Sequence, residues 1–353
     1  MSEDIKEPNR EQPQLTDLSG NSALFICHEI RTPLTSIKGA LGLLHTGQLG
    51  SLSHEGQQLL AIAINNVNRL SRLAQTLEDK PTLPMTILSR TMVDQLQLEN
   101  NLYKALTHQE FELAYQPIVS MKNNHIIGFE ALARWPQSDT TSIPASVFIP
   151  LAEKLGCIHK LGIWILEQAC HQLHIWQQAY ANQTPLSMSV NLSVAEIFQP
   201  DLIPEVQRIL ETTKILPNTL KIEITESTLI NNNRTAIPVL LALQDMGIQL
   251  YIDDFGTGYS CLSRLQELPI DGLKIDRSFV QSQQWQISKT ICLLARNLGL
   301  DVIVEGVETP EELTALQRAG CTKMQGYYFS KPLDSQSVTA LLSPQSSKVP
   351  VAY

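Results

Sequence analysis

The alternation of short apolar runs with longer helical patterns is the feature that most constrains this fold. From Phe111 onward the sequence predicts strands at 112–119, 126–134, 186–191, 220–225, 248–253, 271–275, 301–305 and 322–325. Helical patterns fall between most of them, as at 146–155, 159–181, 234–246, 286–299 and 310–319. This interleaving predicts an α/β fold, a (β/α)8 barrel of the TIM type. Only residues 121–124 join the first two strands, so these strands should form a hairpin and make the barrel irregular, with one antiparallel strand.

The chain has 353 residues, which leaves room for a second unit before the barrel. Residues 1–20 are polar and predict a disordered lead-in. Residues 21–80 predict a helical hairpin, because Leu34, Ile37, Leu41 and Leu44 follow a coiled-coil spacing. Two helices bury too little surface alone, so we expect a four-helix bundle formed with a second copy. Residues 81–97 should be a linker and connecting helix, residues 98–345 the barrel domain, and residues 346–353 a tail.

Charge and composition exclude several classes of protein. The net charge is −9 and no segment carries a basic stripe, so we expect no nucleic-acid partner. An acidic protein that acts on a phosphate ester would need metal ions to make its site positive. The six cysteines are scattered, the N-terminus has no signal-peptide pattern, and no apolar run approaches the ~18 residues of a membrane span. We therefore expect a cytoplasmic protein without a membrane span.

Two adjacent carboxylates, Asp253 and Asp254, end the apolar stretch 248–252 and precede a glycine-rich loop. Neighbouring side chains of a strand point to opposite faces, so one carboxylate of the pair should lie on the dry side. A buried carboxylate is costly unless it is paired or binds a metal. The pair alone is compatible with a simple turn or with a divalent-metal site under a loop that touches substrate.

Polar residues stand at or near the ends of seven consecutive predicted strands. They are Glu130, Asn191, Glu223, the pair Asp253 and Asp254, Lys274, Glu305 and Gln325. Catalytic residues of a TIM-type barrel lie at the C-terminal ends of its strands. This coincidence indicates one active site at that end of the barrel.

The motifs around these residues resemble the EAL family of cyclic-di-GMP phosphodiesterases from about Leu98 to Leu342. The motifs are, in order, GFEALAR, NLS, EITES, DDFGTGYSCLSRL, LKIDRSFV, VEGVET and QGYYFSKPL. The resemblance implies hydrolysis of one phosphodiester of cyclic di-GMP to linear pGpG, with Mg²⁺ or Mn²⁺, two ions per active site. The stretch from Gln281 to Ser288 is several residues shorter than is usual in the family, which bears on the family's dimer contacts.

The resemblance also implies a role for each site residue. Glu130, Asn191, Glu223 and Asp253 match the first metal site, and Asp253, Asp254 and Glu305 match the second. Their carboxylate and amide oxygens are hard ligands that suit Mg²⁺ or Mn²⁺, and two such ions can activate water for an in-line displacement. The same family match makes Glu130, Lys274, Glu305 and Gln325 catalytic, with Lys274 orienting the water and Gln325 supporting the water or metal.

Further positions match substrate and loop contacts of the family. Arg134 matches an arginine that binds a substrate phosphate, and Gln116 matches a substrate-contacting strand end. Glu226 and Glu308 match glutamates that support the loop Gly256, Thr257 and Gly258. Some EAL domains have lost catalytic residues and only bind the nucleotide, so a cyclic-di-GMP receptor that signals to a histidine-kinase pathway is the alternative function.

The N-terminal hairpin carries the motif FICHEIRTPLT around His28. Over about Ala23 to Asp79 it resembles the dimerisation and phosphoacceptor (HisKA) domain of histidine kinases. In that family His28 would accept a phosphoryl group, Glu29 would act as the base, and Thr32 would lie at the phosphatase position. No ATP-binding motifs follow. The hairpin could be a homodimerisation module, a substrate of a separate histidine kinase or response regulator, or a competitor that pairs with a kinase.

Overall fold

The computed structural model describes residues 33–44, residue 50, the single positions 56, 60, 63, 64, 67 and 70, and residues 90–138, 141–180, 184–226, 233–257 and 265–343. The chain divides into two units, residues 1–100 and residues 101–353. In the first unit, residues 33–44 are helical, and so are the single positions from 56 to 70. Leu34, Leu60 and Val67 are buried there. The described part of each arm is therefore helical, as predicted for the hairpin, and the four-helix bundle stays a prediction.

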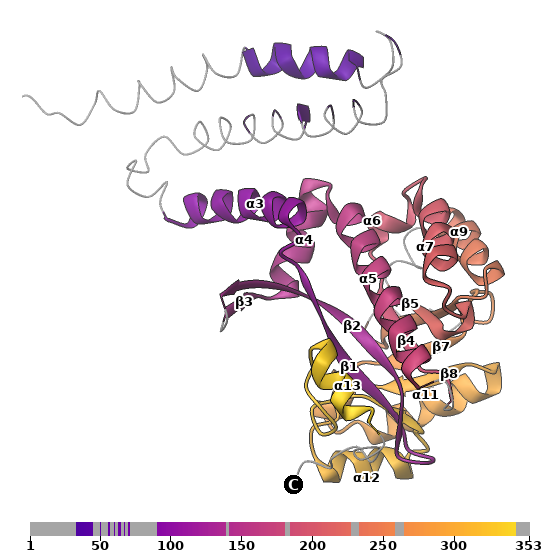
Figure 1. Ribbon diagram of the computed structural model, residues 1–353. Coiled ribbons are helices and arrows are strands. Elements are labelled where there is room, and N and C mark those ends of the chain that lie inside the picture. The colour runs from indigo at the N-terminus through magenta and orange to yellow at the C-terminus, as the bar shows by residue number, and fades with distance from the viewer. Residues whose placement is uncertain are drawn as a thin grey trace, which may run out of the picture. The chain divides into compact units, whose positions relative to one another are not determined.

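The second unit contains a closed barrel of eight strands (Figure 1). The barrel strands are β1 (Glu112–Ser120), β2 (His125–Ser138), β4 (Ser187–Asn191), β5 (Leu220–Thr225), β6 (Gln249–Phe255), β7 (Gly272–Ile275), β8 (Asp301–Val304) and β9 (Lys323–Met324). From β2 through β4 to β9 neighbouring barrel strands are parallel. The first strand, β1, runs antiparallel to both β2 and β9 and closes the ring. The predicted irregular barrel, with its antiparallel hairpin strand, is confirmed.

Helices connect most of the barrel strands. They are α4 (Ala145–Leu155), α5 (Ile158–Ala179), α6 (Val194–Ile197), α7 (Leu202–Thr213), α9 (Asn233–Asp245), α10 (Arg277–Gln281), α11 (Trp285–Leu298) and α12 (Pro310–Arg318). Two further helices flank the set of strands in sequence: α3 (Arg90–His108) precedes β1, and α13 (Ser335–Leu341) follows β9. Among them, α5 packs on β4, α9 on β6, and α11 on β7 and β8. None of the described helices is long and apolar enough to cross a bilayer.

Local sequence signals explain where these helices begin and end. Pro310 starts α12, and a reciprocal capping box between Thr309 and Glu312 satisfies its first amide groups. Asp276 caps α10 by accepting a hydrogen bond from the backbone N–H of Ser278. Gly156 and Gly299 end α4 and α11 in the left-handed conformation that glycine adopts without strain.

The barrel strands are buried on both faces, because helices cover the outside and side chains fill the inside. All four residues of β7 are buried, as are the first five of β5, including the charged residues Lys274, Lys221 and Glu223. Inside the barrel, Ile118, Tyr251 and Ile303 form an apolar layer. Asp253 on β6 and Glu305 after β8 follow this layer toward the C-terminal ends of their strands.

An additional short strand, β3 (Thr141–Ile143), was not predicted. It pairs antiparallel with the extended end of β2, outside the barrel ring. Its three residues are too few to give a periodic pattern, and β2 itself runs four residues beyond its predicted end at Arg134. The C-terminal end of β2 therefore extends away from the barrel, where it pairs with β3 (Figure 1).

Candidate active site

Barrel closure brings the strand-end residues together around the side chain of Lys274. Its ammonium Nζ lies 3.2 Å from Glu130 Oε2 and 2.6 Å from Glu223 Oε2. It also lies 3.3 Å from Asp253 Oδ1 and 2.5 Å from Glu305 Oε1. Lys274 is fully buried, which alone would lower its pKa, but the four carboxylates raise its pKa well above the usual value. The site is therefore an anionic cluster with one resident cation.

Glu130 receives several hydrogen bonds that stabilise its ionised form. The amide nitrogen of Asn191 donates to Glu130 Oε1 at 2.8 Å, and that of Gln325 donates to Oε2 at 2.7 Å. Gln325 also donates to Gln116 Oε1 at 2.9 Å. Burial would raise the pKa of Glu130, but the charge of Lys274 and these bonds hold that pKa below its usual value. Residues from β1, β2 and β4, with Gln325 directly after β9, thus form one polar network.

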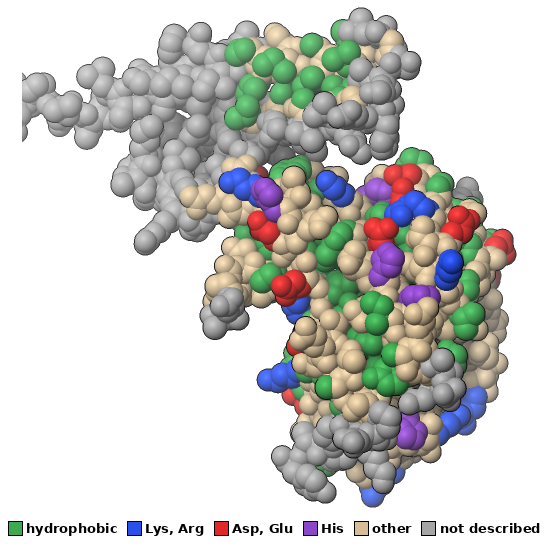
Figure 2. Space-filling view, viewed as in Figure 1, with side chains coloured by type: hydrophobic (Ala, Val, Ile, Leu, Met, Phe, Trp, Pro, Cys, Tyr) green, Lys and Arg blue, Asp and Glu red, His purple; other side chains and the backbone are tan. Residues whose placement is uncertain are grey.

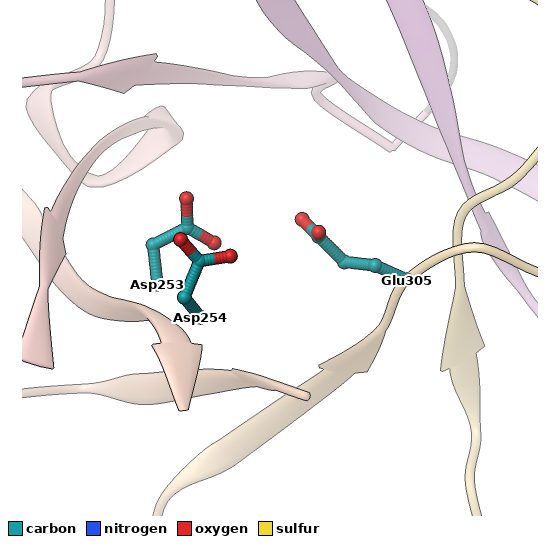
Figure 3. A group of neighbouring side chains, drawn as sticks. All are labelled: Asp253, Asp254 and Glu305. Atoms are coloured by element: carbon teal, nitrogen blue, oxygen red, sulfur yellow. The ribbon is translucent and has the colours of Figure 1, made fainter. Parts of the chain in front are cut away.

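Asp253 and Asp254 both face the cluster, although neighbouring side chains of a regular strand point to opposite faces. Asp253 Oδ1 is buried, as expected for one member of the pair, and Asp254 is exposed. Figure 3 shows the two carboxylates side by side and directed toward Glu305. The strand register shifts between Ile252 and Phe255, and Asp254 has a left-handed φ of 52°. A bulge of this kind breaks the two-residue alternation and redirects a side chain. Ligand oxygens of Asp253, Asp254 and Glu305 lie within 4.8 Å of one another.

Three other carboxyl groups, those of Glu223, Asp254 and Glu305, hold their protons more tightly than usual. Burial raises the pKa of Glu223 to about 8, with the charge of Lys274 opposing the shift. Burial and the charge of Asp253 raise the pKa of Glu305 to about 7 and that of Asp254 to about 6. One ammonium does not neutralise five neighbouring carboxylates, so the cluster favours additional positive charge.

The donor set fits a hard divalent cation. Glu223 Oε1 and Asp253 Oδ1 are buried and accept no hydrogen bond among the described residues, and buried carboxylate oxygens are stabilised by a metal ion. All the charged donors are oxygen atoms, as Mg²⁺ and Mn²⁺ prefer. Asn191 presents its NH₂ group to Glu130, so its amide would have to turn for its oxygen to bind a cation.

A cavity of about 680 Å³ opens over the cluster, a size typical of small-molecule sites. The cavity is lined by Gln116, Glu130, Leu132, Asp253, Asp254, Thr257, Asp276, Arg277, Ser278, Gln281, Glu305, Gly306, Glu308, Gln325, Gly326 and Tyr327. Arg134 is half-buried, lies two residues beyond Leu132 on β2, and donates to the carbonyl of Ala133 at 3.0 Å. It therefore lies on the Glu130 side of the strand without being part of the lining.

The loop after β6 is held by one of the two predicted glutamates. Glu226 is buried, and its Oε2 accepts a hydrogen bond from the backbone N–H of Gly256 at 3.2 Å. Thr257 lines the cavity and hydrogen-bonds through its hydroxyl to the Asp254 carbonyl at 2.9 Å. Glu308 also lines the cavity, where its backbone N–H bonds to Glu312.

Some predicted site residues lie outside the described part of the chain. Gly258 is one of them, and so are the phosphoacceptor candidate His28 and its neighbours Glu29 and Thr32. The lead-in and the tail, residues 1–20 and 346–353, lie outside it as well.

Several residues that line the cavity were not predicted from the sequence, among them Asp276 and Tyr327. Asp276 lines the cavity, and its charge adds to burial and to the charge of Asp253 in raising the pKa of Asp254. Tyr327 also lines the cavity, with 53% of its side chain exposed. Asp276 follows Lys274 by two residues, so period-two spacing along a strand would have suggested it. Tyr327 follows Gln325 by two residues in the same way.

Two family models match the chain. One, described as the EAL domain, matches residues 99–332. The other, described as the His Kinase A (phospho-acceptor) domain, matches residues 24–79.

Curated relatives match the same barrel region. The chain is 38% identical over 244 residues to the cyclic di-GMP phosphodiesterase NbdA of Pseudomonas aeruginosa, which covers 68% of this chain and 31% of NbdA. It is 37% identical over 252 residues to the bifunctional diguanylate cyclase/cyclic di-GMP phosphodiesterase MucR of the same species, covering 70% of this chain and 36% of MucR. The chain thus spans about a third of the length of these relatives.

Solved structures share the fold. The PaMucR phosphodiesterase in its c-di-GMP complex superposes with a TM-score of 0.65 at 36% identity, covering 69% of this chain and 99% of that one. The EAL enzyme Bd1971, in a form with cAMP and cyclic-di-GMP bound, gives a TM-score of 0.68 at 32% identity, covering 83% of this chain and 77% of that one.

Proposed function

Because the chain belongs to the EAL family, we propose that its barrel is a cyclic-di-GMP phosphodiesterase that produces linear pGpG. The observation that carries this proposal is the cluster of Glu130, Glu223, Asp253 and Glu305 around Lys274. This cluster opens into a cavity of about 680 Å³. Relatives with this domain are named as phosphodiesterases of that nucleotide, and one solved neighbour is a c-di-GMP complex.

Divalent cations are part of the proposal because the cavity is acidic and the substrate is an anion. Glu130, Asn191, Glu223 and Asp253 would hold one Mg²⁺ or Mn²⁺, and Asp253, Asp254 and Glu305 a second. Bound cations would neutralise the phosphate charge and lower the pKa of a water molecule. Glu223 Oε1, which is buried without a hydrogen-bond partner among the described residues, supports this assignment.

The protein side chains would supply orientation and proton control. Lys274 contacts carboxylates from four strands, so its ammonium is fixed where it can orient the attacking water. Gln325, which donates to Glu130, would support that arrangement from the opposite side. Arg134 and Gln116 would bind the substrate near the phosphate. Water adds to phosphorus, the 3′ oxygen leaves and takes a proton, and a 5′-phosphate remains on pGpG.

The alternative is a receptor that binds cyclic di-GMP without cleaving it. Incubation of the purified protein with cyclic di-GMP and Mg²⁺ or Mn²⁺, followed by chromatography of the nucleotides, distinguishes the two functions. The enzyme should accumulate pGpG, and EDTA should stop it. Binding of cyclic di-GMP without any pGpG would establish the receptor instead.

For the N-terminal unit we propose homodimerisation. Ile37 and Leu70 are 46% and 45% exposed, and hydrophobic side chains gather over the described helical residues of this unit (Figure 2). Such a surface is covered when two hairpins form a four-helix bundle. A histidine kinase or response regulator that phosphorylates His28 in trans would be the further partner, in the cytoplasm.

A further inference from the structure

Two buried thiols touch each other on the outer side of the barrel. Cys292 lies in α11, and Cys321 lies between α12 and β9. Their Sγ atoms are 3.3 Å apart, and the side chains are 6% and 4% exposed. The contact joins residues 29 positions apart, so it is made by the tertiary fold.

The distance and the surroundings favour bond formation between the two sulfur atoms. A disulfide has an S–S length of about 2.05 Å, so the sulfur atoms need to approach by a little over 1 Å. The hydrogen bond from Cys321 lowers the pKa of Cys292, burial opposes the shift, and the charge of Arg296 adds to the lowering. A thiol with a lowered pKa is the more reactive nucleophile at neutral pH.

The other described cysteines provide an internal contrast. Burial raises the pKa of Cys157 to about 11 and that of Cys170 to about 12. Both thiols are free and buried, and Cys170 is 0% exposed. The hydrogen bond with Cys292 and burial raise the pKa of Cys321 as well, so the contrast with Cys157 and Cys170 lies in the lowered pKa of Cys292 and in its 3.3 Å contact with a second sulfur atom.

We propose that Cys292 and Cys321 form a peroxide-sensitive dithiol that oxidises reversibly to a disulfide. The Cys292 thiolate attacks one oxygen of hydrogen peroxide, the O–O bond breaks, and hydroxide leaves and takes up a proton, which gives a sulfenic acid and water. The Cys321 sulfur then attacks the Cys292 sulfur, the S–O bond breaks, and a second water leaves with the thiol proton. Two thiols are oxidised and one peroxide is reduced to two waters.

The bond would join two elements that adjoin the carboxylate cluster. A methyl group on Gly256 would lie 3.9 Å from Cδ1 of Ile291, the neighbour of Cys292, so α11 packs beneath the loop after Asp254. On the other side, Cys321 precedes Gln325 by four residues, and Gln325 donates to Glu130. Oxidation would therefore join α11, which packs against the Gly256 loop, to the segment that leads through β9 to Gln325. The disulfide itself does not depend on the proposed function.

Peptide mapping of the full-length protein tests the proposal without an activity assay. Reduced protein is treated with hydrogen peroxide, alkylated under denaturing conditions and digested. The expected product is a cross-linked peptide pair containing Cys292 and Cys321, which dithiothreitol releases. Cys157 and Cys170 should be recovered in alkylated form. In Cys321→Ser the second thiol is missing, so a sulfenic acid on Cys292 should be trapped by dimedone.

Several outcomes would overturn the proposal. One is recovery of Cys292 and Cys321 as free thiols after peroxide treatment that oxidises a small reference thiol. Another is cross-linking of either residue to Cys27 or Cys261 in place of its partner. Peptide mapping uses the wild-type protein, so its result decides the proposal even if the Cys321→Ser variant does not fold.

Discussion

At the scale of the residue, Lys274 is the cation that holds the site together. It is 0% exposed and contacts carboxylates from β2, β5, β6 and the end of β8. Removal of one partner from a buried ion pair leaves an uncompensated charge, which costs far more than removal of a surface pair. This lysine therefore matters for stability as well as for the proposed reaction.

We expect Lys274→Met to lower the free energy of unfolding by about 3–5 kcal/mol in the absence of divalent cations. Mn²⁺ should recover more stability in the variant than in the wild type, because the carboxylates then lack their ammonium. The matched control is Lys323→Met, whose half-buried pair with Asp301 should cost about 1 kcal/mol. Chemical denaturation with and without Mn²⁺ measures both. Equal losses in the two variants would contradict the assignment.

Glu196 gives a pH prediction away from the cluster. It is 3% exposed, and burial raises its pKa from 4.5 to about 7. The folded state therefore binds the proton more tightly, so this group's contribution to stability is complete below pH 4.5 and is lost as the pH rises through 7. Glu196→Gln should remove a decline of up to about 3 kcal/mol between those values, while still accepting the Ser193 N–H bond. Unfolding at pH 4.5 and pH 8 checks this, and an unchanged slope in the variant would refute it.

Residue types at strand ends were predictable, but their contacts were not. The polar ends of Glu130, Glu223 and Lys274 stand out in the sequence because each interrupts an apolar strand. Lys274 and Glu130 are 144 residues apart, however, and only barrel closure brings the ammonium between carboxylates. The direction of the Asp254 side chain could not be predicted either, because a bulge turns it inward and no pattern in the sequence marks that bulge.

At the scale of the element, the loop after β6 depends on Gly256. This residue has a φ of 97°, and a Cβ atom there would lie 2.7 Å from the ring of Phe279. Its N–H also bonds to the buried Glu226. Backbone freedom and close packing therefore both require glycine at this position.

Gly256→Ala should lower the melting temperature and weaken Mn²⁺ binding, because the loop must move away from Phe279 and Asp254 moves with it. Gly299→Ala is the control, since its φ is 75° but nothing lies within 4 Å of the added methyl. The control should show only the backbone cost of about 1 kcal/mol, and the clash should add about 1–3 kcal/mol at Gly256. Calorimetry measures both effects. Variants of equal stability and equal Mn²⁺ affinity would show that the Phe279 contact is unimportant.

Elements with a strong period were predictable and short ones were not. Strand β5 occupies the predicted residues 220–225, because Leu220, Ile222 and Ile224 alternate with polar residues and give a period of two. Strand β3 has three residues, two of them exposed, so it carries no such pattern. It forms because β2 extends past the barrel and offers a free edge.

At the scale of the whole molecule, the motifs predict the order of the two units along the chain. They do not determine which unit forms the dimer. Deletion of residues 1–80 should lower the molecular mass in solution from that of a dimer to that of a monomer if the hairpin forms the proposed bundle. Light scattering coupled to gel filtration measures the mass of both chains. An unchanged dimer mass would show that the barrel associates alone.

Under the proposed function, the carboxylate cluster around Lys274 hydrolyses cyclic di-GMP with divalent cations. The most direct measurement is the initial rate of pGpG formation by Glu130→Ala and wild type at saturating Mn²⁺, with the fold of each checked by circular dichroism. Glu130 would be a cation ligand, so its loss should cost more than the roughly 10- to 100-fold typical of residues that only support a ligand. A variant rate near that of the wild type would contradict the account.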